Sequence, residues 1–299
     1  MRADQAHPEI TVVLPTYNRS EFIGDAIRSV LAQTYTKFEL IIVDDGSGDD
    51  TESIVKTFSD PRIIYCYQPN SGRSIARNNA IAIARGKYIA FIDSDDMYLP
   101  RKLEIQYRLL ERTPSTDMVY TSAKCINRDG SYLSQNYRAT ISGAIYTSIA
   151  FFRPVTIILP TVMLRKSIFN QIGNFDQNMN RFEDTDMWRR VSKVSHIVAL
   201  PEFTCLIRTH EQNSLATQDP RSILEALRYY SNKILSEDRD AGALVIRMGL
   251  GRLYCYYATA FLTVSGWHGY SKEAFNVGFQ FWPPIAIKYY LTKLKHSLI

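Results

Sequence analysis

The sequence lacks several patterns that identify large classes of protein. Its four cysteines stand singly, without a Cys-x-x-Cys pair, so neither a zinc knuckle nor a disulfide framework is indicated. No Gly-x-Gly-x-x-Gly follows the first predicted strand, and the P-loop, His-Glu-x-x-His and Gly-x-Ser-x-Gly patterns are absent. These absences disfavour a dinucleotide-dependent dehydrogenase, a P-loop kinase, a zinc protease and an α/β-hydrolase.

Long apolar runs are missing as well. Residues 1–8 contain no apolar core of a signal peptide, so we expect a reducing, cytoplasmic setting. The uncharged stretch 253–271 has 19 residues, but it includes threonine, serine, glycine and histidine. A helix that spans a membrane needs ~20 predominantly apolar residues. We therefore expect no transmembrane span.

An excess of one charge sign is absent from the first two thirds of the chain. Residues 1–218 carry 25 Lys and Arg against 24 Asp and Glu, whereas residues 219–299 carry 10 against 6. The near-neutral first part disfavours nucleic-acid binding. After Glu273 there is no acid, only lysines among aromatic residues. This mixture suits peripheral contact with the cytoplasmic membrane face, or else packing on the first part or on a second subunit in an oligomer.

Strand-like and helix-like segments alternate in the first hundred residues. This alternation predicts an α/β domain with a mostly parallel sheet and helices on both faces. From Pro220 the apolar pattern is helical, so we divide the chain into an α/β domain at 1–218 and a helical region at 219–299. Strands are predicted at 10–14, 38–43, 63–68 and 88–92, and helices at 22–31, at 51–59 and within 71–85.

Three of the predicted strands end in polar or acidic clusters. In parallel α/β sheets, ligands bind outside the carboxyl ends of the strands. Convergence of these three ends would therefore make one site. The clusters are Pro15-Thr16-Tyr17-Asn18, Asp44-Asp45 and Asp93-Ser94-Asp95-Asp96.

The third cluster has the chemistry of a metal site. Carboxylates that follow a buried strand at this spacing can hold a hard divalent ion, and Mg²⁺ or Mn²⁺ is the usual partner of a diphosphate. Loop acids that cap a helix or face water are the ordinary alternative. Three crowded carboxylates repel one another unless a cation is present, which favours a metal site at Asp93–Asp96.

Other polar groups could bind a ligand, and each of them also has an ordinary structural interpretation. Asp45 lies in a sequence that suits a turn, yet its carboxylate could accept a base N–H from uracil, thymine or guanine, but not from adenine or cytosine. Arg73, Arg77 and Asn78 lie at a helix start, where anions are favoured, or on a solvated basic face.

An acidic group and a single histidine in the second half of the chain complete the set of candidate site residues. Glu183-Asp184, with Asp186, forms a carboxylate group that also suits the first turn of a helix. His210 could bind a metal or contact phosphate, although a single histidine is more often structural.

Five segments together resemble a known family, the family 2 glycosyltransferases, over roughly residues 9–212. These enzymes have the GT-A fold and depend on a metal and a nucleotide sugar. They invert the anomeric configuration of the sugar that they transfer. The motifs stand in the family's order and spacing. They are Val12–Arg19, Leu31–Tyr35, Phe38–Ser47, Gly72–Asn78 and Gly86–Asp96.

The resemblance implies a role for each matching position. Glu183-Asp184 matches the family's Glu-Asp pair, whose aspartate is the proposed general base, here Asp184. Arg208-Thr209-His210 is similar to an Arg-x-His associated with the metal and diphosphate. By the same resemblance, Pro15, Thr16 and Tyr17 (with Asn18 beside them) line the base pocket, Asp45 accepts the base N–H, Arg77 and Asn78 lie near the ribose and diphosphate, Asp93 lies nearby, Asp95 faces the ribose and metal, and Asp96 holds the metal.

The expected function is transfer of one sugar from a nucleotide sugar, foremost a UDP-sugar, to a hydroxyl of a glycan or lipid-linked acceptor in surface polysaccharide synthesis. Mn²⁺ or Mg²⁺ is the expected cofactor. Processive members of the family carry Gln-x-x-Arg-Trp and several membrane helices, whereas Trp188-Arg189-Arg190 is the only Trp-Arg cluster here. The alternatives are an inactive nucleotide-sugar or glycan-binding protein with this fold, and a nucleotidyltransferase, which would need a phosphate loop that the first strand lacks.

Overall fold

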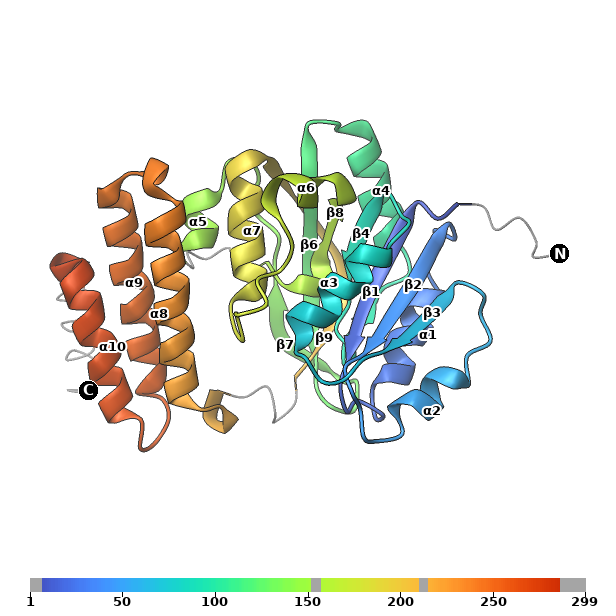
Figure 1. Cartoon of the computed structure of the whole chain (residues 1–299), viewed down its shortest axis with the longest axis horizontal. Helices are drawn as coiled ribbons and strands as arrows, with labels where there is room; N and C mark the ends of the chain where they lie inside the picture. The colour runs from blue at the N-terminus through green and yellow to red at the C-terminus, as the bar shows by residue number, and fades with distance from the viewer. Residues whose placement is uncertain (1–6, 152–156, 210–214, 286–299) are drawn as a thin grey trace. The chain divides into compact units, whose positions relative to one another are not determined.

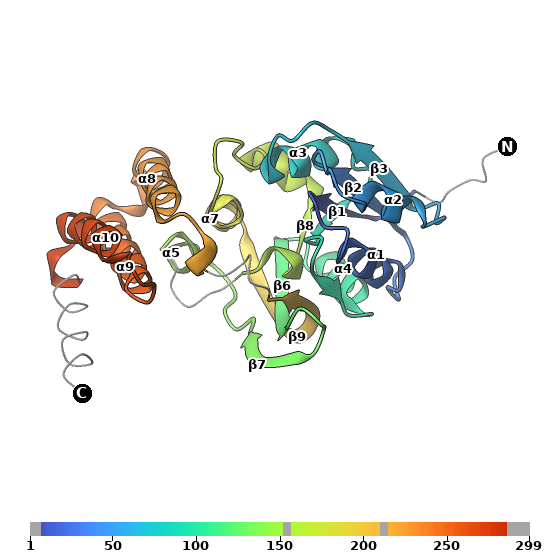
Figure 2. The ribbon, with the colours of Figure 1, turned by 90° about the horizontal axis from the view of Figure 1, so that it is seen from below.

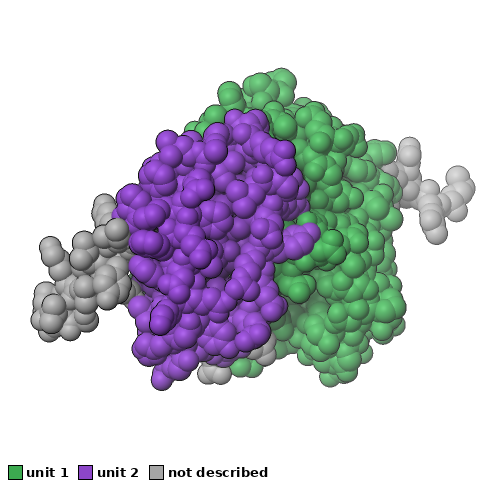
Figure 3. Space-filling view, turned by 60° about the vertical axis from the view of Figure 1, so that its left-hand side comes forward, with its two compact units in different colours: residues 1–145, 155–209 green, residues 146–154, 210–299 purple. Residues whose placement is uncertain are grey.

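The computed structural model describes residues 7–151, 157–209 and 215–285 (Figure 1). The chain divides into two compact units, coloured separately in Figure 3. The first consists of residues 1–145 and 155–209, and the second of residues 146–154 and 210–299. The larger part of the second unit starts at residue 210, and the unit also includes residues 146–154, which the sequence pattern assigned to the α/β domain.

The first half of the sheet is parallel, as predicted. In β1, β2 and β4 every residue is buried, which explains why these strands are nearly continuous apolar runs. The four strands lie in the order β3-β2-β1-β4. Their bounds are β1 (Ile10–Thr16), β2 (Phe38–Asp44), β3 (Ile63–Tyr67) and β4 (Tyr88–Phe91).

The second half makes the sheet mixed. Strand β8 lies antiparallel to both β4 and β6, while β9 runs parallel to β6. The short strands β5 and β7 pair antiparallel with β9 and β6. The parallel arrangement expected from the sequence therefore ends at β4. These strands are β5 (Met97–Tyr98), β6 (Thr116–Ile126), β7 (Tyr132–Tyr137), β8 (Val162–Arg165) and β9 (His196–Arg208).

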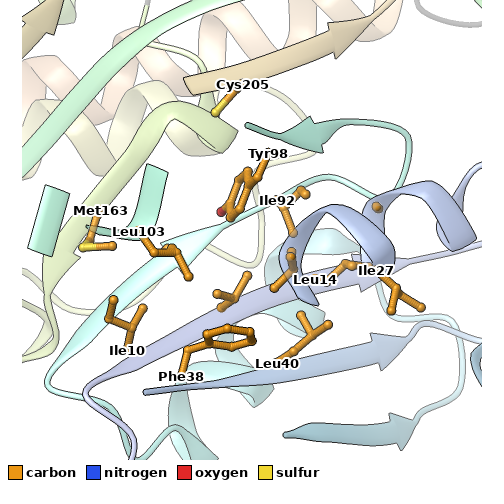
Figure 4. Close-up of a cluster of buried hydrophobic side chains, with 14 of the residues drawn as sticks. Ile10, Leu14, Ile27, Phe38, Leu40, Ile92, Tyr98, Leu103, Met163 and Cys205 are labelled. Carbon is orange, nitrogen blue, oxygen red and sulfur yellow. The ribbon is translucent and has the colours of Figure 1, made fainter. Parts of the chain in front are cut away.

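Helices cover both faces of the sheet, with α3 on one face and α1 and α4 on the other (Figure 2). Apolar side chains from strands and helices fill the space between, with Leu14, Phe38, Ile92 and Leu103 among the buried residues (Figure 4). The helices of this unit are α1 (Ile23–Leu31), α2 (Thr51–Lys56), α3 (Arg73–Ile83), α4 (Lys102–Arg112), α6 (Phe169–Ile172) and α7 (Glu183–Val194). Single 3-10 turns precede β8 at Leu159–Thr161 and α6 at Lys166–Ile168.

Gly86 lets the chain enter β4 close against β1. A Cβ atom at this position would lie 2.5 Å from the backbone nitrogen of Thr11 and 2.6 Å from the carbonyl carbon of Ile10. The backbone N–H of Gly86 also donates a hydrogen bond to Thr11 Oγ1 at 3.0 Å. Because the obstructing atoms belong to the backbone of the central strand, they cannot move aside as a flexible side chain would.

Gly86→Ala is therefore expected to destabilise the first unit by about 2 kcal/mol or more, because overpacking of a filled core typically costs 1–3 kcal/mol. Thermal unfolding measures this as a Tm lower by roughly 4 to 8 °C. Gly269→Ala is the matched control, since nothing lies within 4 Å of its added Cβ. An unchanged Tm for Gly86→Ala would show that β4 does not depend on this close approach.

The second unit is helical, in line with the pattern after Pro220. Two glycines allow α9 and α10 to pack closely, since a Cβ at Gly251 would lie 3.2 Å from the carbonyl oxygen of Gly278. The uncharged stretch 253–271 is divided between these two helices, and no helix in the described ranges is long and apolar enough to span a membrane. The elements are α5 (Tyr146–Ala150), α8 (Pro220–Glu237), α9 (Ala243–Phe261) and α10 (His268–Phe281), with 3-10 turns at Leu215–Thr217 and Arg239–Ala241.

Candidate active site

The three polar clusters expected to converge do follow neighbouring strands at one sheet edge. Thr16 at the end of β1 pairs with Asp44 at the end of β2. On the other side of β1, the backbone N–H of Ile92 donates to Val13 at 3.0 Å, just before Asp93. Since β2, β1 and β4 are adjacent and parallel, their carboxyl ends form a single edge.

The cluster after β1 combines an exposed aromatic ring with a buried hydroxyl. Pro15 and Thr16 are buried, whereas Tyr17 is 47% exposed. Among the atoms that the structure describes, Thr16 Oγ1 has no hydrogen-bond partner. Asn18 adopts a left-handed backbone with φ of 50°, and its Oδ1 accepts a hydrogen bond from Gly48 N at 2.8 Å. A buried hydroxyl without a partner is costly, which marks this point as one where a ligand could bind.

Asp45 is buried and organises the loop that leads into α3. Its Oδ1 accepts hydrogen bonds from Gln68 Nε2 at 2.7 Å and from Ser71 N at 2.8 Å, and its Oδ2 accepts one from Gly72 N at 2.8 Å. A carboxylate offers about four acceptor positions. Within the described part of the chain, one position on Oδ2 is left for a base N–H. The structural role of Asp45 could not be read from the sequence, and its predicted contact with a base stays a prediction.

Arg77 and Asn78, both on α3, are buried. Arg77 donates from Nη1 to Glu183 Oε1 at 2.9 Å and from Nη2 to Asp93 Oδ1 at 3.1 Å. Asn78 exchanges two hydrogen bonds with the backbone of Phe175, at 2.9 and 3.0 Å. Asn78 thereby holds the segment that leads to Glu183. Its predicted place near the ribose and diphosphate is not tested by these contacts.

The acidic cluster after β4 is crowded. Burial raises the pKa of Asp96 well above its usual range, and the charges of Asp95 and Asp93 raise it further. Asp96 Oδ1 accepts a hydrogen bond from Arg208 N at 2.8 Å, and Asp95 Oδ2 lies 3.8 Å from Arg19 Nε. A divalent cation would relieve the repulsion, and an all-oxygen set suits Mg²⁺ or Mn²⁺.

The predicted metal ligands are only partly described. His210 lies outside the described residues, and within those residues no group of three or more His, Cys, Asp or Glu side chains is arranged to hold a metal ion. Asp95 and Asp96 fit a divalent ion by the chemistry of their oxygens. Their role as ligands stays a prediction.

Arg208, at the end of β9, ties the acidic cluster to the rest of the fold. Its Nε donates to the carbonyl oxygen of Asp95 at 3.0 Å, its Nη1 to that of Arg128 at 2.7 Å, and its Nη2 to Asp25 Oδ2 at 3.2 Å. The Arg-x-His resemblance pointed to this position, but the long strand β9 was not predicted, so its contact with Asp95 was not foreseen.

Glu183 and Asp184 open α7, and their environments push their pKa values apart. Burial raises the pKa of Asp184 to about 6, and the neighbouring charge of Glu183 adds to the effect. Burial acts the same way on Glu183, but Arg73 and Arg77 outweigh it and lower the pKa of Glu183. A pair of carboxylates separated in this way is typical of acid–base sites. Asp184 is thus ionised at neutral pH yet basic enough to take a proton.

The remaining residues of this motif are structural. Asp186 is fully buried and accepts from Arg189 at 2.8 Å and from Arg190 at 2.9 Å. Trp188 is buried, and its ring centroid lies 6.2 Å from that of Phe91. The Trp-Arg cluster therefore belongs to the packing of α7 beneath the site.

Comparisons with known proteins show what the chain is similar to. The model of the family described as "Glycosyl transferase family 2" matches residues 11–173. An uncharacterized glycosyltransferase of Rickettsia felis is 36% identical over 201 residues, which cover 67% of this chain and 33% of that protein. Chondroitin synthase of Escherichia coli is 31% identical over 189 residues, or 62% of this chain and 27% of that protein. The chain spans about a third of the length of these relatives.

Among solved structures, residues 1–349 of Staphylococcus aureus TarS in complex with UDP-GlcNAc align with a TM-score of 0.70. The alignment covers 93% of this chain and 82% of that chain at 20% sequence identity. At this identity the likeness concerns the fold.

Proposed function

Because this chain belongs to glycosyltransferase family 2 and has the GT-A fold, we propose that it transfers a single sugar from a nucleotide sugar to a hydroxyl of a growing polysaccharide. The observation that carries the proposal is the connection of three features. The buried hydroxyl of Thr16, without a partner among the described atoms, and the crowded carboxylates of Asp93–Asp96 follow neighbouring strands at one sheet edge. The basic carboxylate of Asp184 is connected to them because Arg77 binds both its neighbour Glu183 and Asp93.

In the proposed reaction Asp184 is the general base. Inversion requires the acceptor hydroxyl to attack the anomeric carbon from the side opposite the departing nucleoside diphosphate. A carboxylate within ~2.6–3.2 Å of that hydroxyl takes its proton as the new bond forms. Glu183, held by two arginines, keeps its charge and stays beside Asp184 without competing for the proton.

Asp95 and Asp96 are the proposed ligands of Mg²⁺ or Mn²⁺, with His210 as the third. When bound, the ion would neutralise the charge that grows on the leaving diphosphate. Arg208 N donates a hydrogen bond to Asp96 Oδ1, and Arg208 Nε holds the backbone carbonyl of Asp95. The chain thus holds the Asp96 carboxylate and the backbone of Asp95 before any ligand binds.

We propose UDP as the nucleotide of the donor. The remaining acceptor position on Asp45 Oδ2 suits an N–H of uracil, thymine or guanine. The exposed ring of Tyr17 offers a flat surface against which a base can stack. TarS has been solved with UDP-GlcNAc bound, which supports a uridine nucleotide for a chain of the same fold.

We propose transfer of a single sugar without processive extension, because the sequence lacks the Gln-x-x-Arg-Trp motif of processive members and its only Trp-Arg cluster is packed in α7, with Trp188 and Arg189 buried. Synthesis of surface polysaccharides is the proposed setting, and chondroitin synthase is one relative whose name refers to a polysaccharide. Peripheral contact with the cytoplasmic membrane face stays a prediction. This prediction depends on the basic aromatic segment near the C-terminus. Much of that segment, including Lys288, Lys293 and Lys295, lies outside the described residues.

Thermal unfolding with a panel of nucleotides tests the proposal. UDP, GDP, dTDP, CDP and ADP are each added with Mn²⁺, with Mg²⁺ or with a chelator. A ligand at 100 times its Kd stabilises by ~2.7 kcal/mol, which raises Tm by several degrees. We expect a metal-dependent rise with UDP and none with CDP or ADP. A rise in Tm with GDP or dTDP instead would identify a different nucleotide sugar as the donor. No rise in Tm with any nucleotide would reject the proposal that the chain is a transferase.

A further inference from the structure

A buried arginine connects the two carboxylate clusters of the site. Arg77 on α3 binds Glu183 Oε1, 106 residues away in sequence, and Asp93 Oδ1, 16 residues away. Glu183 is the neighbour of the proposed base, whereas Asp93 begins the proposed metal-binding segment. No other arginine in the described ranges is seen to bridge these two clusters.

The guanidinium is committed to these contacts. The Arg77 side chain is 4% exposed, and its Nη1 and Nη2 each donate to a carboxylate. It also lies over the ring of Phe175, with 5.5 Å between the guanidinium carbon and the ring centroid. Only Nε lacks a partner among the described atoms. A donor molecule would therefore meet a guanidinium whose two terminal nitrogens each already hold a carboxylate.

We propose that Arg77 is a positioning residue, which fixes Glu183 and Asp93 in one arrangement and thereby orients Asp184 toward the donor. This inference rests on the proposed function, and it replaces the expected contact of Arg77 with the diphosphate. A planar guanidinium can hold two carboxylates at once in a fixed geometry, whereas an ammonium acts as a point charge. Arg77 thus couples the segment that carries the base to the segment that begins with Asp93.

The charges around Asp184 give the bridge a measurable signature. Burial and Glu183 raise the pKa of Asp184, while Arg77 and Arg73 on α3 lower it, and Thr185 N donates to it at 2.6 Å. Arg73 is 56% exposed and lies 3.3 Å from Glu183 Oε1. Because a buried charge is screened less than an exposed one, loss of Arg77 should affect Asp184 more than loss of Arg73.

Two variants test the inference. Arg77→Lys keeps the charge but cannot hold both carboxylates, so we expect kcat to fall at least 10-fold while the Kd for UDP changes less than 3-fold. Arg77→Met also removes the charge, so we expect a further loss of kcat and an acid limb of the kcat–pH profile that moves to higher pH. Arg85→Met is the matched control, because Arg85 pairs with the buried Glu39 outside the site. It should lose stability without moving the acid limb.

Opposite results would overturn the inference. If the affinity for UDP falls as much as kcat in Arg77→Lys, Arg77 contacts the donor. If kcat is unchanged, the bridge has no effect on the reaction.

A readout without turnover separates this inference from the proposed function. The carboxyl carbon resonance of Asp184, assigned with Asp184→Asn, can be titrated in ¹³C-labelled protein. We expect a higher pKa of Asp184 in Arg77→Met than in the wild-type protein, even if no transfer is detected. An unchanged pKa would reject the inference, whereas failure of the wild-type protein to bind any nucleotide would reject only the proposed function.

Discussion

Asp184→Asn is expected to lower kcat by at least ~10²-fold, because an amide cannot take the proton of the attacking hydroxyl. The substitution preserves shape, and the hydrogen bond that Asp184 Oδ1 accepts from Thr185 N can persist through the amide oxygen. Donor binding should therefore change little. Steady-state kinetics and UDP titration on the same preparation measure both quantities. A variant with wild-type turnover would remove Asp184 from the role of base.

The pH profile gives an independent test of the same residue. Burial raises the pKa of Asp184 to about 6, so the carboxylate is protonated below that pH and the base is lost. We expect kcat of the wild-type protein to fall about tenfold per pH unit below pH 6, as for loss of a single essential base. This acid limb should be missing from the residual activity of Asp184→Asn. A limb that persists in the variant would assign the titration to another group.

Asp96→Asn is expected to abolish the metal-dependent part of UDP binding. Asn keeps the acceptor for Arg208 N, so the fold around the loop should survive. It lacks the negative charge that a divalent ion requires of its carboxylate ligand. Thermal unfolding with UDP and Mn²⁺ should show the several-degree rise in wild type and little in the variant.

Asp129→Asn serves as a control for charge, since Asp129 is an exposed loop residue whose Oδ1 accepts from Ser131 N. It should keep the full rise in Tm with UDP and Mn²⁺. A full rise in Asp96→Asn would exclude Asp96 as a ligand of the metal.

The sequence was sufficient to predict the part of the fold that carries the site. Strands β1, β2 and β4 are buried on both faces, so each is an apolar run that ends where its polar cluster begins. Parallel order then places those clusters at one edge. The grouping of Glu183 and Asp184 could also be predicted, because these two carboxylates are adjacent in the sequence.

Contacts between distant segments could not be predicted. Strand β7 has mostly exposed residues, and in β9 the residues Pro201 and Glu202 interrupt the apolar pattern, so neither is recognisable as one continuous strand. The antiparallel direction of β8 depends on its pairing with β4 and β6. The bridge from Arg77 to Glu183 joins segments with no local pattern in common, and the hydrogen bonds of Asp45 and Asn78 are likewise tertiary.

In the proposed reaction Asp96 serves the donor and the metal, whereas Asp184 takes the acceptor proton. Calorimetric titration of UDP in the presence of Mn²⁺ into Asp184→Asn and Asp96→Asn, side by side with wild type, tests it most directly. We expect a Kd within about 3-fold of wild type for Asp184→Asn and at least 10-fold weaker binding for Asp96→Asn, a loss of about 1.4 kcal/mol or more. Equal weakening in both variants, or weakening in Asp184→Asn alone, would contradict it.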